Sequence, residues 1–217
     1  MSTVVRMAQQ ATAQIFIDFE GNEKLPPTLL GVLVRTNDQE IFQQFIFEDA
    51  FAVLVPSTQH PQLRVATLEH VLLDLDDRYG QDAPIYAWSN HEQDVINEHL
   101  VGCGIAESWA GRVTNAKGLA KPWARKHYPN HKFEKRMRRG THTLDQYLSL
   151  INYKVPTVHA AGKTGSRLTA LRQIILDGRP FEQWPPSMKK YWTNLLAHNM
   201  HDCFGMKALV DQIMKIA

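Results

Sequence analysis

Two carboxylates stand two residues apart inside an apolar stretch near the beginning of the chain. Asp18 and Glu20 lie in QIFIDFEG, where their neighbours are β-branched or aromatic. Because residues i and i+2 of a strand project from the same face, the two side chains would lie side by side. A divalent cation would relieve their repulsion, and Mg²⁺ or Mn²⁺ prefers such oxygen ligands. The alternative is that both acids line a solvated edge of the strand.

A second acidic group follows the apolar residues IYAW. Ser89 and Glu92 fit a capping box at the start of a helix, which gives Glu92 a structural role. Asp94 then remains as the candidate ligand in the first helical turn. The alternative for Asp94 is also structural, since acids in a first turn interact favourably with the helix dipole.

The third group lies in LAHNMHDCFGMKAL near the end of the chain. His198 and Asp202 are four residues apart, and Gly205 continues the same helical face. An acid in an apolar helix is expected to face a polar site, and a helical glycine costs about 1 kcal/mol relative to alanine. The glycine would let another backbone approach closely. The alternative is a solvated face with a chance His–Asp pair.

The elements that must position these residues follow an α/β pattern. Apolar stretches at 13–21, 28–36 and 40–49 are separated by short polar turns and predict an antiparallel meander. A fourth strand is expected at 83–89 and a short fifth within 111–120. Helical spacing is present at 62–80, 91–102, 141–151, 162–178 and 191–216. We therefore predict one α/β domain over residues 1–217, with a five-stranded mixed sheet flanked by helices.

Positive charge is concentrated in one segment. The formal net charge is only +2, yet ten Lys/Arg and one acid fall between Arg112 and Arg139. We interpret residues 112–140 as a basic helical insertion that binds nucleic acid, because clustered cations attract the phosphate backbone. Trp123, Tyr128 and Phe133 would stack on bases, or turn into the core of a solvated basic helix. The candidate substrate contacts are Lys121, Arg125, Lys126, Lys132, Arg136 and Arg139.

Several other classes of protein do not fit the sequence. Cys103 and Cys203 lie far apart and form no CxxC, which argues against a zinc site or a disulfide framework. No apolar run approaches the roughly 20 residues that span a bilayer, and the first residues lack a signal-peptide pattern. We expect a cytoplasmic protein without a membrane partner.

The three acidic groups together resemble a known family. IDFEG on a first strand, N-x3-D after a later strand and H-x3-D-C on a late helix resemble the DEDD exonucleases of the ribonuclease-H-like superfamily. The opening FIDFEG…LLGVLV and the closing HNMHDCFGM are most similar to the RecB-associated predicted ribonuclease-H-like nuclease group. The similarity covers most of the chain in order and spacing, and it implies a ribonuclease-H-like fold.

The resemblance implies a site for two Mg²⁺ or Mn²⁺ ions. Asp18 would bridge them, Glu20 and Asp202 would complete the site, and Asp94 would hold the second ion directly or through water. Some relatives use an acid at the position of Glu92, so Glu92 is the alternative to Asp94.

The same resemblance suggests how water would be activated. His198 stands where the family places a Tyr or His that orients or deprotonates water, and His201 competes with it. The spacing to Asp202 is that of the Tyr subclass, although the residue here is His.

The expected activity is 3′→5′ exonucleolytic hydrolysis of single-stranded DNA or RNA. Two alternatives remain: a catalytically inactive nucleic-acid-binding module of a larger assembly, or an endonuclease on the same fold.

Overall fold

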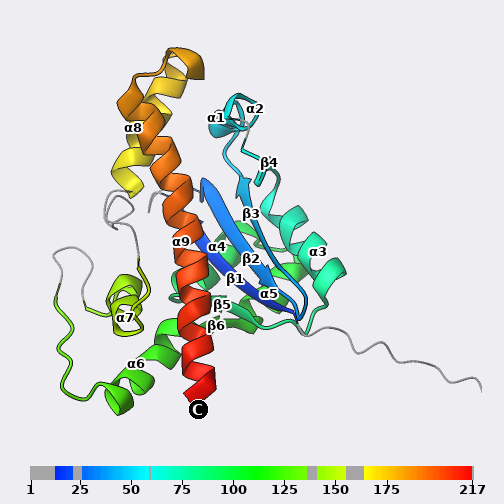
Figure 1. Cartoon of the computed structure of the whole chain (residues 1–217). Coiled ribbons are helices and arrows are strands. Elements are labelled where there is room, and N and C mark those ends of the chain that lie inside the picture. Colours follow the sequence, from blue (N-terminus) through cyan, green and yellow to red (C-terminus); the bar gives the residue numbers. More distant parts are fainter. Residues whose placement is uncertain (1–12, 22–25, 59, 136–140, 155–163, 217) are drawn as a thin grey trace, which may run out of the picture.

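A six-stranded mixed sheet forms the centre of the molecule (Figure 1). The computed structural model describes residues 13–21, 26–58, 60–135, 141–154 and 164–216. The strand order is β4-β3-β2-β1-β5-β6. The strands are β1 (Gln14–Glu20), β2 (Leu29–Arg35), β3 (Glu40–Ile46), β4 (Leu63–Val65), β5 (Ile85–Ala87) and β6 (Val113–Asn115).

The strands β1, β2 and β3 form the predicted antiparallel meander. On the other side of β1, the strands β5 and β6 run parallel to it, and β4 runs parallel to β3 at the opposite edge. Strand β1 therefore has a neighbour on each side, and residues projecting from it lie at the middle of a sheet face.

The prediction of five strands is wrong by one, because β4 lies in the segment assigned to the start of a helix. Leu63 is buried, whereas Arg64 and Val65 are exposed at the sheet edge. The helix begins only at Leu68, after Thr67, whose side chain accepts a hydrogen bond from the His70 amide as an N-cap. The coarser prediction of a mixed sheet flanked by helices is confirmed.

Helices cover both faces of the sheet. They are α1 (Asp49–Ala52), α2 (Leu54–Thr58), α3 (Leu68–Tyr79), α4 (His91–His99), α5 (Gly104–Arg112), α6 (Ala116–His127), α7 (Leu144–Leu150), α8 (Thr164–Leu176), the 3₁₀ helix η2 (Phe181–Gln183) and α9 (Pro186–Ile216). None of the helices in the described part of the chain is long and apolar enough to cross a membrane.

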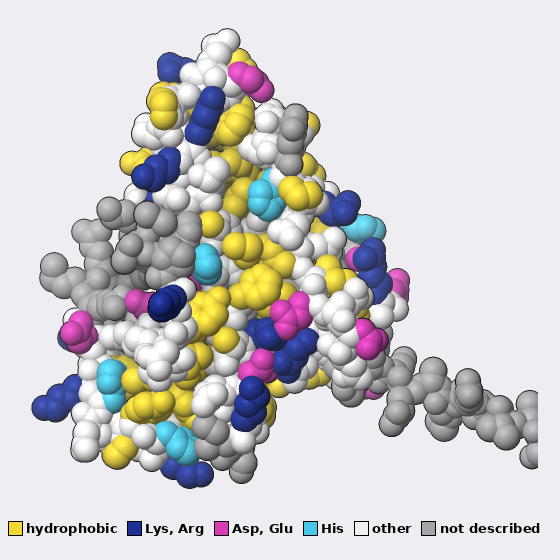
Figure 2. Space-filling model, in the orientation of Figure 1, with side chains coloured by type: hydrophobic (Ala, Val, Ile, Leu, Met, Phe, Trp, Pro, Cys, Tyr) yellow, Lys and Arg dark blue, Asp and Glu magenta, His cyan; other side chains and the backbone are white. Residues whose placement is uncertain are grey.

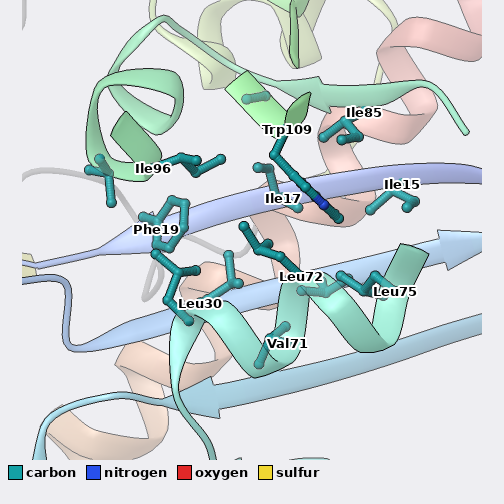
Figure 3. Close-up of a cluster of buried hydrophobic side chains, with 14 of the residues drawn as sticks. Ile15, Ile17, Phe19, Leu30, Val71, Leu72, Leu75, Ile85, Ile96 and Trp109 are labelled. Carbon is teal, nitrogen blue, oxygen red and sulfur yellow. The ribbon is translucent and has the colours of Figure 1, made fainter. Parts of the chain in front are cut away.

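The alternation along β1 assigns its residues to the two faces. Ile15, Ile17 and Phe19 pack against α3, α4 and α5, and the indole of Trp109 lies among them (Figure 3). Phe16 belongs to the opposite cluster, formed with α6, α7 and α9. Asp18 and Glu20 share the parity of Phe16, so they project toward α9.

A third apolar cluster anchors the remaining helices. Leu29 and Ile46 at the ends of their strands pack with α1, α2, α8 and the first half of α9. Helix α9 thus contacts two clusters along its length and crosses the sheet face between them (Figure 1). The middle of α9, which carries the His–Asp motif, lies over β1 and β2.

Candidate functional site

Asp18 and Glu20 lie on one face of the central strand, as the i, i+2 spacing predicts. Glu20 is 8% exposed, and Asp18 is partly buried under α9. Because Glu20 is buried and Asn199 of α9 covers the Asp18 carboxylate, the alternative in which these acids line a solvated sheet edge is wrong. Two carboxylates are therefore held close together in the protein interior.

Asn199 of α9 holds Asp18 from above the sheet. Its side-chain Nδ2 donates to the Asp18 backbone oxygen at 2.8 Å and to carboxylate Oδ2 at 2.9 Å. Its Oδ1 accepts from Gln44 Nε2 at 2.8 Å, and that amide also donates to the Leu196 carbonyl oxygen at 3.0 Å. Since one end of the Asn199 amide receives a donor and the other faces acceptors, its orientation is fixed.

Gly31 makes room for this contact. In the sheet register it lies between Asp18 on β1 and Gln44 on β3. A Cβ atom at Gly31 would lie only 2.3 Å from Asn199 Oδ1. The lack of a side chain on β2 therefore lets the amide reach across the strand to both neighbours.

His198 lies between two carboxylates. Its Nε2 is 3.7 Å from Glu20 Oε1, and its Nδ1 is 3.6 Å from Asp202 Oδ1. The residue is only 7% exposed. Helix α9 thus brings the sequence-predicted residues His198 and Asp202 to Glu20, while His201, one residue before Asp202, is partly buried.

The third acid at the site is Glu92, the alternative to the predicted Asp94. Glu92 is 4% exposed at the start of α4, and Asp94 is exposed to solvent. Half of the expected capping box is present: the Ser89 amide and hydroxyl donate to Glu92 Oε2 at 3.3 and 3.2 Å, but the hydroxyl accepts from the His91 amide and the N-cap position is Asn90. The charge of Glu92 nevertheless raises the pKa of Asp18, whereas the charge of Asp94 is not among the causes of that shift. The capping role and the site role therefore belong to one side chain.

These carboxylates raise the pKa of Asp18 well above its usual range. Burial is the largest cause, and the charges of Glu20, Asp202 and Glu92 follow, while the hydrogen bond from Asn199 opposes them. Burial likewise raises the pKa of Glu92. Four acids from β1, α4 and α9 therefore share one electrostatic environment.

The negative charge of these acids also affects the pKa of the neighbouring Cys203. It is fully buried on α9, and burial raises the pKa of its thiol well above the usual value. The charges of the same four carboxylates raise that pKa further. The thiol is therefore held in its protonated form, which does not favour a nucleophilic role.

The donor chemistry of the site fits a divalent cation. Carboxylate oxygens are the ligands preferred by Mg²⁺ and Mn²⁺, and a cation would offset the repulsion that raises the Asp18 pKa. Among the described residues, no three His, Cys, Asp or Glu side chains already surround one point as metal ligands. Binding would therefore require the carboxylates to turn toward one another.

The basic residues lie apart from the acids, on and after α6. Lys121, Arg125 and Lys126 are exposed on the helix, and Lys132 is exposed beyond its end. The remaining two predicted contacts, Arg136 and Arg139, lie outside the described residues.

The aromatic residues among these cations are mostly turned inward. Trp123 is 6% exposed and packs in the cluster under α9, so for Trp123 the core alternative holds. Tyr128 donates its hydroxyl to the Leu150 carbonyl oxygen at 2.9 Å. Phe133 is half-buried against Tyr147.

Three residues of the site were not singled out from the sequence: Gly31, Gln44 and Asn199. A glycine within a strand is a recognised sign of close approach by another group. Gln44 interrupts an apolar strand in the same way that Asp18 does. Gly205, which was expected to admit another backbone, instead accommodates the side chain of Leu148.

The chain matches no protein-family model, no curated protein and no solved structure. A functional conclusion therefore depends on the chemistry of the site: four buried or partly buried carboxylates, a histidine between two of them and an amide network that fixes the central one.

Proposed function

We propose that this chain is a metal-dependent nuclease with a ribonuclease-H-like fold, hydrolysing phosphodiester bonds. The observation that carries the proposal is that β1, α4 and α9 bring four acids together around Asp18. Burial and their like charge raise the pKa of Asp18. Buried like charges are costly, so their retention is most simply explained by a bound cation. The mixed sheet, with an antiparallel meander beside parallel strands, supports the fold assignment.

The residues have distinct proposed roles. Asp18, Glu20, Asp202 and Glu92 would hold Mg²⁺ or Mn²⁺, with Glu92 taking the place first given to Asp94. When bound, two such ions supply activation of water and neutralisation of charge at phosphorus. Asn199 keeps the Asp18 carboxylate facing the site.

His198 is the proposed proton acceptor. Its ring is held between Glu20 and Asp202, on the face where substrate would bind. An imidazole is suited to accept a proton from water near neutral pH. His201 is the competing candidate. The 3′→5′ direction and the preference for single strands rest on the family resemblance.

The proposal is tested first by thermal unfolding in chelator and in millimolar Mn²⁺. A ligand at a hundred times its Kd stabilises by about 2.7 kcal/mol, which raises Tm by roughly 5–10 °C in a chain of this size. We expect that shift in the parent and its loss in Asp18→Asn and Glu92→Gln. Asp94→Asn, which changes an exposed acid on the same helix, is the matched control and should retain it.

Digestion of end-labelled oligonucleotides then tests the reaction. We expect the parent to shorten single strands from the 3′ end only when Mg²⁺ or Mn²⁺ is present, and Asp18→Asn to be inactive. Internal cleavage would indicate an endonuclease. Absence of both cleavage and metal stabilisation in the parent would overturn the proposal and favour the inactive nucleic-acid-binding module.

A further inference from the structure

A cavity of about 410 Å³ lies at the end of α6, away from the acidic site. This size is within the range of small-molecule sites. Among the described residues that line it, two carry a permanent positive charge and none is acidic. The basic and aromatic residues that line the cavity are Lys121, Arg125, Tyr128, His131, Phe133 and His142.

The walls of the cavity are held in place by contacts behind them. His142 Nδ1 is 2.6 Å from the Tyr147 hydroxyl, and the ring of Phe133 lies 4.6 Å from that of Tyr147. The His142 amide donates to Gln146 Oε1 at 3.0 Å, which secures its left-handed backbone at φ 70°. A non-glycine residue held in this region costs free energy, and such residues cluster at binding sites.

Positive charge faces the cavity from one side of α6. Burial lowers the pKa of His142, and the charges of Lys121, Lys117 and Arg125 lower it further. These cations therefore act on the interior of the cavity as well as on solvent. In the lower left of Figure 2, over α6 and α7, hydrophobic side chains lie among His, Lys and Arg.

The cavity is linked to the acidic site through α7. At its middle, Tyr147 makes an edge contact with Trp88, the rings 5.4 Å apart, and Trp88 directly precedes the Ser89 that binds Glu92. Just beyond its end, Tyr153 lies close enough to Asp202 for that charge to add to the effect of burial in raising its pKa. Helix α7 therefore contacts both the wall of the cavity and residues beside the acidic site.

We propose that this cavity binds one nucleotide of the substrate strand, other than the nucleotide at the scissile bond. Arg125 and Lys121 would contact its phosphate, since a guanidinium can bind two phosphate oxygens at once. The base would lie against the aromatic wall formed by Tyr128, Phe133 and His142. This inference rests on the proposed function, because it assumes a nucleic-acid substrate.

Binding is tested without cleavage, in the Asp18→Asn background and in chelator. The probe is a fluorescein-labelled single-stranded decanucleotide, with anisotropy read at several salt concentrations. We expect Lys121→Ala/Arg125→Ala to weaken binding about tenfold and to reduce the slope of log K against log salt by about 0.7, for the one phosphate that the two side chains contact.

The matched control is Arg64→Ala/Lys190→Ala. This variant also removes one exposed Arg, on β4, and one exposed Lys, in the first part of α9. We expect its affinity to stay within about twofold of the background and its salt slope to be unchanged. Equal weakening by both pairs, or no weakening by either, would overturn the cavity as a site.

A second comparison tests whether a base is recognised. The background protein should bind the decanucleotide more tightly than an abasic strand of equal length, and Phe133→Leu should remove that preference while keeping the salt slope. Equal binding of the two strands by the background protein would show an anion site only and overturn the nucleotide assignment. If the parent did not cleave nucleic acid but the predicted differences in binding were found, only the nuclease proposal would be rejected.

Discussion

At the scale of single residues, the amide of Asn199 determines how Asp18 is presented. It donates to the backbone oxygen and to the carboxylate of Asp18, and it accepts from Gln44. Asn199 is fully buried and Gln44 is 1% exposed, so their mutual hydrogen bond lies away from water, while the two bonds to Asp18 are partly buried. A fully satisfied buried network of this kind is rigid, and a partly satisfied one is costly.

Gly31→Ala should disrupt this network. The new Cβ would meet Asn199 Oδ1 at 2.3 Å and Cγ at 2.7 Å, and the amide cannot retreat without losing Asp18 or Gln44. Overpacking at such a position costs about 1–3 kcal/mol. Urea unfolding should show this loss, together with a smaller rise in Tm on adding Mn²⁺.

Gly111→Ala is the control for that substitution. Gly111 is in α5, where an added Cβ has no atom within 4 Å in the described structure. Alanine should therefore leave stability unchanged or raise it by up to about 1 kcal/mol. A Gly31→Ala protein as stable as Gly111→Ala would show that Asn199 is free to move.

At the scale of elements, an ion pair joins α8 to the end of β3. Arg172 binds Glu48 through two hydrogen bonds, from Nε at 2.6 Å and from a terminal nitrogen at 2.8 Å. Thr28 donates to the same carboxylate at 2.9 Å, and the guanidinium lies 5.7 Å from the centre of the Phe51 ring. Both charged side chains are mostly shielded from solvent, so this pair is a stronger contact than a surface ion pair.

Arg172→Met should destabilise the protein by about 1–3 kcal/mol at pH 7, because Glu48 would lose its charged partner. Burial alone would raise the Glu48 pKa, but the hydrogen bonds from Arg172 and Thr28 outweigh it and lower that pKa. The pair therefore stabilises the fold fully above the usual glutamate pKa, and this contribution is lost as pH falls through the lower folded value. The difference from the parent should thus shrink in acid.

Arg78→Met provides the comparison for a solvated pair. Arg78 contacts Asp74 at 2.7 Å on α3, but its side chain is 58% exposed. Its loss should change the free energy of unfolding by less than about 0.5 kcal/mol. Equal effects of the two substitutions in urea unfolding would contradict a special role for the Arg172 pair.

The long strands, most of the helices and the short strands β5 and β6 could be predicted from the sequence, whereas β4, α1, α2 and the nine-residue helix α5 could not. The meander was recognised because seven-residue strands alternate or carry a continuous apolar run. Strand β4 has three residues, two of them exposed, which leaves no period to detect. Helices α1 and α2 were not predicted either, because four and five residues complete barely one turn.

At the scale of the whole molecule, the site was predictable in part because its residues come from motifs that local patterns mark. Asp18, Glu20, His198 and Asp202 are brought together as expected. Glu92 is predicted first as a helix-capping residue and only as the alternative to Asp94 at the site, whereas in the structure one of its oxygens accepts from Ser89 while its charge acts on Asp18.

The contact that fixes the site lies beyond any local pattern. Asn199 reaches Asp18 across 181 positions of sequence. Neither the polarity of Asn199 nor that of Gln44 indicates a partner so distant along the chain. Only the register of three strands under one helix brings Gly31 between them.

The charge of the acidic site should govern how the stability of the whole chain depends on pH. Burial and like charge raise the folded pKa of Asp18, and burial raises that of Glu92. The folded chain therefore binds more protons than the unfolded chain between the usual carboxyl pKa, about 4, and these higher values. The resulting contribution to stability is fully present below that usual value and is lost as pH rises through the folded pKa values.

In chelator, the free energy of unfolding of the parent should thus fall more between pH 5 and pH 8 than that of Asp18→Asn/Glu92→Gln, whose amides carry no charge to bury. Asp94→Asn should follow the parent. Mn²⁺ should restore stability at the higher pH, where it competes with few protons for the carboxylates. Parallel profiles for the parent and the double variant in chelator would mean that these acids keep ordinary pKa values, and the electrostatic reason for a cation at the site would be lost.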